Sequence, residues 1–167
     1  MLILARHGET VWNVEGRIQG QKDSPLTARG VEQAKQLGRL RRLNPCPIFA
    51  SPLGRVTATI NLLGLSGKIF YDSRLEEMNF GDYEGIIKSQ SPYTISAWDE
   101  SYPNGESYKD VYNRAMKFLC TLPTNIPGPI LIIAHETINK YLAGITLQLP
   151  REKILTLKQP NGLVWLV

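Results

Sequence analysis

Two apolar runs, each followed by a histidine, constrain the fold of this chain more than any other feature. The run LILA at residues 2–5 is followed by Arg6 and His7, and the run PILIIA at residues 129–134 is followed by His135. Short, continuous apolar runs are typical of strands buried on both faces of a parallel sheet. Because parallel strands end at the same edge of a sheet, we expect both histidines of the chain to lie at that edge.

Strand and helix patterns alternate along the rest of the chain. Apolar residues at helical spacing predict helices over residues 27–43, 51–64, 106–122 and 136–147, the first of them capped by Thr27. Short β-forming runs predict strands at residues 48–50, 68–71, 155–157 and 163–167. This alternation predicts a three-layer α/β/α fold with a mostly parallel central sheet.

Two irregular stretches are candidate functional segments. The polar loop over residues 7–24 is longer than a usual connection from strand to helix. Residues 72–103 carry several glycines, prolines and aromatic side chains, and we expect an insertion over about residues 78–104 that covers a site. Neither a repeat nor a linker divides the sequence, so it predicts one domain over residues 1–167.

Composition argues against several functional classes. The 19 Lys and Arg exceed the 15 Asp and Glu by four, a surplus too small for a dedicated nucleic-acid binder. No apolar stretch approaches the roughly 20 residues of a membrane span, and the apolar start is too short for a signal peptide. We expect a cytoplasmic monomer or homodimer without nucleic-acid or membrane partners.

The two cysteines carry no recognisable chemistry. Cys46 and Cys120 lack metal-ligand spacing, and no Cys-x5-Arg run follows either of them. This pattern argues against a cysteine-dependent phosphatase and against a disulfide framework. We interpret both residues as buried or incidental thiols.

The residues around the two histidines suit phosphoryl transfer. That chemistry needs cations at the non-bridging oxygens, a nucleophile in line with the leaving oxygen, and a proton for the leaving group. Arg6 and Arg55 supply planar cations close to strand-to-loop transitions. Arg6 would also keep His7 neutral and nucleophilic. His135 precedes a predicted helix, where backbone N–H groups favour a bound anion.

The segment LEEMNFGDYEG at residues 75–85 is the expected source of the proton. It places carboxylic acids among apolar residues, and a buried carboxyl beside a phosphate would retain its proton for the leaving group. Other mechanisms lack their residues, because the chain has no Asp-x-Asp pair, no Walker loop and no histidine cluster. We therefore expect a reaction without metal or cofactor.

The run RHGET at residues 6–10, followed by Asn13, resembles the signature of the histidine phosphatase superfamily, which has the phosphoglycerate-mutase-like fold. SPLGRVTAT at residues 51–59 resembles the family segment that carries a second arginine. The acidic segment at residues 75–85 and IIAH at residues 132–135 match the family's acid and second histidine. PNGES at residues 103–107 matches a helix start of the phosphatase branch, so the resemblance covers nearly the full length.

The resemblance implies a role for each matching position. It makes His7 the residue that becomes phosphorylated. It makes Glu77 the proton donor, because Glu77 rather than Glu76 stands at the position that the acid occupies in the family's pattern. It implies a phosphate clamp made of Arg6, Arg55 and His135.

Further positions follow from the same resemblance. Asn13 would add a polar contact to the phosphate, and Gln19 and Gly20 would lie near the substrate. Many members of the family have a glycine at the position of Glu136. We expect the Glu136 carboxylate to point away from the phosphate along the first turn of its helix, where an acidic residue is favourable.

These observations favour a metal-independent phosphomonoester hydrolase that acts on a small phosphorylated metabolite through a phosphohistidine, and that resembles the α-ribazole and broad-specificity phosphatases. A phosphoglycerate mutase-type phosphotransferase is the alternative enzyme. Mutases of this fold carry longer insertions and a C-terminal segment that shield the intermediate from water, so this short chain favours hydrolysis. A non-catalytic phosphate-binding regulatory domain is the third possibility, and turnover of an aryl phosphate would exclude it.

Overall fold

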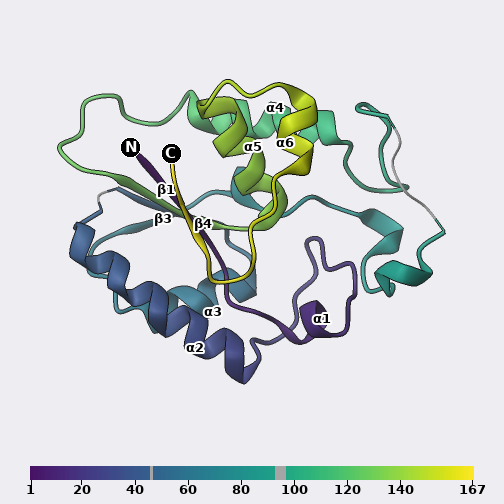
Figure 1. The fold of residues 1–167 in the computed structure, drawn as a ribbon, viewed down its shortest axis with the longest axis horizontal. Coiled ribbons are helices and arrows are strands. Elements are labelled where there is room, and N and C mark those ends of the chain that lie inside the picture. Colours follow the sequence, from purple (N-terminus) through teal and green to yellow (C-terminus); the bar gives the residue numbers. More distant parts are fainter. Residues whose placement is uncertain (46, 93–96) are drawn as a thin grey trace.

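One sheet holds the two strands that end at histidines side by side. The computed structural model describes residues 1–45, 47–92 and 97–167. These residues form a five-stranded sheet in the order β3-β2-β4-β1-β5 (Figure 1). The strands are β1 (Leu2–Arg6), β2 (Ile48–Ala50), β3 (Ile69–Tyr71), β4 (Ile130–Ala134) and β5 (Val164–Leu166). Only β5, at one edge, runs antiparallel to its neighbour among the described strands.

Helices cover both faces of this sheet (Figure 1). One face packs against α2 (Ala28–Leu37) and α3 (Gly54–Leu63), and the opposite face packs against α4 (Tyr108–Leu119), α5 (Glu136–Thr146) and α6 (Arg151–Thr156). A single turn, α1 (Val11–Val14), lies in the loop after β1. The predicted three-layer α/β/α fold with a mostly parallel sheet is confirmed.

The central strands alternate between two hydrophobic cores. Leu2 and Leu4 of β1 lie in the core beneath α4 and α5, whereas Ile3 and Ala5 lie in the core beneath α2 and α3. The residues of β4 alternate in the same way, and all five are buried. Because both faces of these strands are covered, their sequences are apolar at successive positions.

The helix that precedes β4 begins with a side-chain cap. Ser107 accepts a hydrogen bond from the backbone N–H of Asp110, and the Asp110 carboxylate accepts one from the backbone N–H of Ser107. This reciprocal capping satisfies N–H groups that have no partner within the helix. The cap places the first residue of α4 two positions after the predicted start at residue 106.

The predicted strand at residues 155–157 is wrong, because most of this segment belongs to α6. Pro150 precedes the helix and has a backbone conformation compatible with a helix start. Ile154 is buried against Gly144 of α5, whereas Leu155 is exposed. Ile154, the buried residue of α6, therefore anchors a short helix in a segment whose apolar run favoured a strand. The closing strand expected within residues 163–167 is present as β5.

The segment between β3 and α4 contains short 3₁₀ turns. They cover Ser73–Leu75, Gly81–Tyr83 and Lys88–Gln90, and another 3₁₀ turn, Gly38–Leu43, continues α2. In Figure 1 the segment between β3 and α4 lies on the same side of the molecule as the loop that contains α1. A β-bridge between Arg17 and Ile87 joins the described part of the insertion expected over residues 78–104 to the loop that follows His7.

The remaining expectations concern thiols and membranes. Cys120 is an exposed free thiol, and Cys46 lies outside the described residues. Within the described ranges, every helix is too short or too polar to cross a membrane.

The loop after β1 approaches α2 so closely that only glycine fits at residue 30. A Cβ on Gly30 would overlap the carbonyl oxygen of Glu9, which accepts a hydrogen bond from the backbone N–H of Thr27. Helix propensity alone would favour alanine over glycine by about 1 kcal/mol. We expect Gly30→Ala to lower the free energy of unfolding by about 1–3 kcal/mol, as overpacking does.

Urea denaturation measures this change. Gln36→Ala, on the exposed side of the same helix, is the matched control and should change the free energy of unfolding by less than about 0.5 kcal/mol. A Gly30→Ala variant as stable as the unmodified protein would contradict the close approach.

Candidate active site

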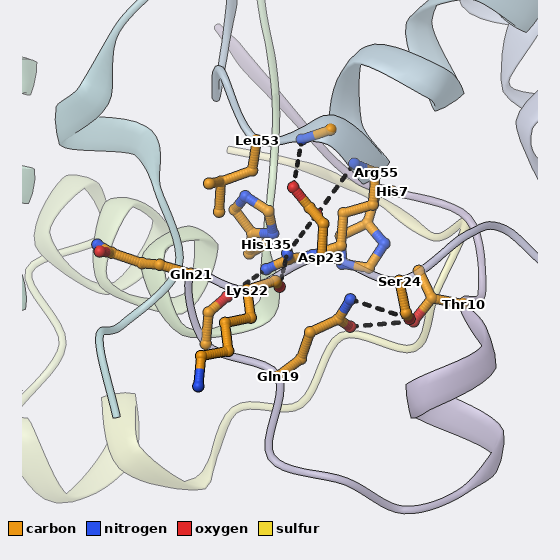
Figure 2. Close-up of polar contacts among 12 residues, drawn as sticks. His7, Thr10, Gln19, Gln21, Lys22, Asp23, Ser24, Leu53, Arg55 and His135 are labelled. Atoms are coloured by element: carbon orange, nitrogen blue, oxygen red, sulfur yellow. Dashed lines mark hydrogen bonds and ion pairs between the residues drawn. The ribbon is translucent and has the colours of Figure 1, made fainter. Parts of the chain in front are cut away.

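The ends of β1 and β4 bring the two histidines together. These strands pair in parallel, with Arg6 opposite Ala134, so the next residues, His7 and His135, leave the sheet as neighbours. Their ring centroids are 5.1 Å apart, and the two residues are 2% and 0% exposed. The sequence-based expectation that both lie at one edge of the sheet agrees with this arrangement (Figure 2).

Hydrogen bonds fix the protonation of His7. Its Nδ1 lies 2.7 Å from the carbonyl oxygen of Gly8, which can only accept, so Nδ1 carries the hydrogen. The Nε of Arg55 donates to Nε2 of His7 at 3.3 Å. Both contacts require the same tautomer, in which Nε2 has a lone pair. His7 therefore presents a nucleophilic nitrogen beside a guanidinium.

His135 is held from the opposite side. Its Nε2 lies 2.8 Å from Oγ of Ser51, which follows β2, and its Nδ1 is buried with no partner among the described residues. His135 is also the N-cap residue of α5. His135 is not among the residues that line the cavity described below, but its ring lies beside that of His7. An orphaned buried ring nitrogen at a helix N-terminus suits an oxyanion ligand.

Arg55 is fixed by the loop that follows β1. Its Nη1 donates to the carbonyl oxygen of Lys22 and to Asp23, both at 2.8 Å, and its Nη2 donates to the carbonyl oxygen of Gly20 at 2.6 Å. Asp23 also accepts hydrogen bonds from the backbone N–H groups of Gly54 and Arg55 (Figure 2). The same carboxylate thus caps α3 and orients the guanidinium that α3 carries.

Arg6 pairs with Glu136, which corrects one prediction. The Nη1 of Arg6 donates to Oε2 of Glu136 at 2.7 Å and also to the carbonyl oxygen of Gln159. Glu136 lines the cavity. The expectation that its carboxylate points away from the site is wrong, because the attraction of a nearby, partly buried guanidinium outweighs the preference for a solvated position on the helix.

Of the two adjacent glutamates, Glu77 lines the cavity and Glu76 does not. The Glu77 carboxylate accepts hydrogen bonds from the backbone N–H groups of Met78, at 2.9 Å, and of Thr137, at 3.3 Å. Glu76 instead lies near Arg114 and Glu106, and burial raises the pKa of its carboxyl. The geometry therefore agrees with the choice of Glu77 made from the phase of the pattern.

Asn13, Gln19 and Gly20 also line the cavity. The Gln19 amide accepts from the Thr10 hydroxyl at 3.0 Å and donates to Ser24 at 3.2 Å (Figure 2). Gln19 is buried, so these bonds hold the loop together. Asn13 accepts hydrogen bonds from the backbone N–H of Thr10 and from the Asn161 amide.

The cavity has a volume of about 540 Å³ and mixed walls. Its cationic side chains include Arg17, Lys88 and Lys140, in addition to the two arginines beside the histidines. Apolar and aromatic residues form another part of the wall: Ile18, Met78, Phe80, Tyr102 and Tyr108. Several of these residues belong to the irregular segment before α4, so this segment does border the site. Burial lowers the pKa of Lys140, and the Glu77 and Glu136 carboxylates partly offset this effect.

Burial and positive charge keep both histidines neutral. The pKa of His7 lies well below its usual value, first because of burial and then because of Arg55 and Arg6. The pKa of His135 is lowered by burial, by Arg55 and by the neighbouring His7. Burial also lowers the pKa of Arg55, while Glu77 and Asp23 oppose that shift. A neutral His7 is the form that can attack an electrophile.

The sequence-based reasoning missed several residues that hold this site. Ser51 follows a predicted strand directly, and the argument applied to Arg6 and His7 could have singled it out. Glu84 accepts hydrogen bonds from the backbone N–H groups of Gln21, Lys22 and Phe80, so it joins the loop after β1 to the irregular segment. The contacts of Glu84 with Gln21 and Lys22 could not be read from a local pattern, because these two partners are 63 and 62 residues away in sequence.

Metal ligands do not gather within the described parts of the chain. There, no group of three or more His, Cys, Asp or Glu side chains is arranged to hold an ion.

Comparisons with known proteins agree on one family. The model of the histidine phosphatase superfamily, branch 1, matches residues 2–167. A protein of Salmonella paratyphi C named probable phosphoglycerate mutase is 40% identical over 160 residues, which cover 88% of this chain and 74% of the relative. A similarly named protein of Erwinia tasmaniensis is 34% identical over 166 residues, with the same coverage.

Solved structures of phosphatases share the fold. A mycobacterial glucosyl-3-phosphoglycerate phosphatase in complex with VO3 has a TM-score of 0.85 and 30% identity, and the match covers 98% of this chain and 90% of that one. The α-ribazole phosphatase of Shigella flexneri has a TM-score of 0.78 and 29% identity, with coverage of 98% and 87%.

The lowered pKa values of His7 and His135 can be measured directly. The chain has only two histidines, so imidazole C–H signals in NMR spectra can be assigned with a His7→Ala variant. We expect neither signal to titrate between pH 8 and about 6, because both rings remain neutral through the usual histidine pKa near 6.5. A titration step near 6.5 for either ring in the folded protein would contradict this result.

The same shifts make stability depend on pH. Between the lowered folded-state pKa and about 6.5, the unfolded chain binds more protons than the folded protein. The free energy of unfolding therefore falls as the pH drops below about 6.5, by about 1.4 kcal/mol per pH unit for each histidine that stays neutral.

Proposed function

Because the chain belongs to the histidine phosphatase superfamily, we propose that it hydrolyses phosphomonoesters through a phosphohistidine on His7. The observation that carries this proposal is the protonation of His7. Its Nδ1–H is committed to the Gly8 carbonyl, and its neutral Nε2 lies beside Arg55 in a cavity that also contains Glu77. This combination supplies a nucleophile, a cation and an acid within one site.

The first step transfers the phosphoryl group to the enzyme. The Nε2 lone pair of His7, released from its hydrogen bond with Nε of Arg55, attacks phosphorus. The bond between phosphorus and the leaving oxygen breaks. The Glu77 carboxyl holds a proton while an anionic phosphate is bound beside it. The leaving oxygen takes this proton and departs as an alcohol. In the second step, water attacks the phosphohistidine and returns a proton to the Glu77 carboxylate. The P–N bond breaks, and inorganic phosphate and neutral His7 are regenerated.

The remaining residues would stabilise the charge on the phosphoryl oxygens. Arg6 and Arg55 carry fixed positive charge, and His135 offers an unpartnered ring nitrogen at the start of α5. Such groups act most strongly where they are already oriented before the reaction. Because the backbone of the loop after β1 and Asp23 fix Arg55, its orientation does not depend on substrate.

The dimensions of the cavity favour a small substrate. About 540 Å³ is within the usual range for small-molecule sites, and the aromatic wall suits a substrate with some apolar surface. We therefore infer a small phosphorylated metabolite as substrate, with neither metal nor other cofactor required.

A mutase is the second candidate, because the Salmonella relative that is 40% identical carries the name probable phosphoglycerate mutase. The two reactions share the phosphohistidine and differ in what accepts the phosphoryl group. Incubation with 3-phosphoglycerate separates them. A hydrolase releases inorganic phosphate, whereas a mutase forms 2-phosphoglycerate.

We expect the protein to hydrolyse an aryl phosphate in the presence of EDTA, and His7→Ala to abolish both turnover and an acid-labile phosphoenzyme. No other described side chain in the cavity combines a neutral nitrogen with this environment. Radiolabelled phosphate trapped on the enzyme by rapid alkaline quench measures the intermediate, and its loss on later acid treatment identifies the acid-labile bond. Label on a residue other than His7, or activity lost to EDTA and restored by Mg²⁺ or Zn²⁺, would disprove this mechanism.

Glu77→Gln should discriminate between leaving groups. We expect it to slow hydrolysis of alkyl phosphates by about 100-fold or more, because a poor leaving group depends on protonation. Aryl phosphates, which leave as stable anions, should slow by less than about tenfold. The measurement is kcat/KM for a matched pair of alkyl and aryl substrates.

Glu76→Gln is the matched control, since it removes the neighbouring carboxyl, which does not line the cavity. It should show no dependence on the leaving group. If Glu76→Gln is the variant with this dependence, the proton donor has been assigned to the wrong residue.

A further inference from the structure

Glu136 brings negative charge into a cavity that carries cations for a phosphate. Its Oε2 lies 2.7 Å from Nη1 of Arg6, and the side chains of Arg6 and Glu136 are 13% and 32% exposed. Both residues line the cavity together with His7. The carboxylate is thus part of the phosphate environment, and the roles given above to the other residues leave it without a function.

The contacts of Arg6 are concentrated on one nitrogen. Nη1 donates to Glu136 and to the carbonyl oxygen of Gln159. Nε is buried without a partner, and Nη2 donates to no residue in the parts of the chain that the structure describes. The Nε and Nη2 hydrogens point in parallel and form the edge of a guanidinium that binds two oxygens at once. Because the protein contacts use Nη1, the Nε–H and Nη2–H groups of Arg6 can both donate to an oxyanion.

Both groups that hold Nη1 are themselves fixed. Glu136 is the first residue of α5, where the helix dipole stabilises a carboxylate. Gln159 is fully buried, and its side-chain amide bonds to the Asn139 amide at 2.8 Å and to the Leu4 carbonyl at 2.8 Å. A long, rotatable arginine side chain is thus held between two rigid elements before any substrate arrives.

The charge of Glu136 has a second effect. The other guanidinium, that of Arg55, is already paired with Asp23 at 2.8 Å. The Glu136 carboxylate similarly offsets the charge of Arg6. A carboxylate beside a bound phosphate repels it, and the partial burial of Glu136 leaves this repulsion stronger than it would be in bulk water. The site therefore binds a phosphate dianion less tightly than two unpaired arginines would.

The geometry points to Glu136 as a positioning residue that holds Arg6 by Nη1 and, through its charge, weakens the binding of phosphate, including the phosphate released as product. This inference rests on the proposed hydrolysis. It assigns Glu136 two separable effects, because the hydrogen bond orients Arg6 while the charge repels the anion.

Two substitutions separate these effects. Glu136→Gln keeps an oxygen that can accept from Nη1 but removes the charge, and Glu136→Ala removes both. The measurements are kcat for an aryl phosphate and the inhibition constant of inorganic phosphate. We expect Glu136→Gln to lower the inhibition constant by about fivefold or more while it retains most of kcat. Glu136→Ala should lower kcat by about tenfold or more, since Arg6 is no longer oriented.

Glu152→Gln is the control for a general change in charge. Glu152 is exposed in the first turn of α6 and does not line the cavity, so both measurements should stay as in the unmodified protein. If the alanine variant does not fold, Glu136→Asn takes its place, because its amide is one carbon too short to keep the contact with Nη1.

Two results would overturn the inference: an unchanged inhibition constant in Glu136→Gln, or an equal loss of kcat in the glutamine and alanine variants. Failure of the proposed function gives a different result, namely no hydrolysis by the unmodified protein. In that case, calorimetric titration of the unmodified protein and Glu136→Gln with inorganic phosphate still tests the effect of charge. Tighter binding by Glu136→Gln supports that effect, and equal binding disproves it.

Discussion

The parallel pairing of β1 with β4 is the interaction on which the site depends. It aligns Arg6 with Ala134, so the chain leaves both strands at the same level and His7 and His135 become neighbours. The strand on the other side of β4 contributes in the same way. This strand, β2, is followed by Ser51, which contacts His135. Residues separated by more than 120 positions in sequence are thus brought together by backbone hydrogen bonds before any side chain contributes.

Charge in the site is arranged in pairs around neutral imidazoles. Each guanidinium has one carboxylate, Asp23 for Arg55 and Glu136 for Arg6. Burying an unpaired charge is costly, so these pairs allow two arginines to stand next to the histidines in the folded protein. Burial, and then the arginines, which disfavour a third positive charge, lower the pKa of both imidazoles and keep them neutral. Through the arginines that they stabilise, these pairs therefore contribute to keeping His7 and His135 neutral.

The sequence predicts those features that depend on local patterns. The continuous apolar runs identify the central strands, and the residue types at their ends identify His7, His135 and Arg6. The segment at residues 155–157 was misread because a short apolar run has no period long enough to distinguish a strand from a helix turn. Only packing of Ile154 against Gly144 decides that case.

The orientation of Glu136 was predicted incorrectly for a different reason. Its position on the helix is local information, but its partner is 130 residues away in sequence. Asp23 and Glu84 present the same difficulty, because Asp23 contacts Arg55 and Glu84 contacts Gln21, each in a distant segment. Sequence patterns thus predicted which side chains meet at the edge of the sheet more readily than which side chains orient them.

The segment before β5 couples one edge of the sheet to His7. The carbonyl oxygen of His7 accepts hydrogen bonds from the backbone of Gly162 and from the side chain of Asn161, and the backbone N–H of Arg6 donates to Leu163. β5 is a short edge strand, and edges of this kind open locally at a lower free energy than a central strand. Each such opening would remove the bonds that the Arg6 N–H and the His7 carbonyl make on this side, while the His7 N–H stays bonded to Ala134 of β4. Opening of this edge would therefore loosen His7 without detaching it from the sheet.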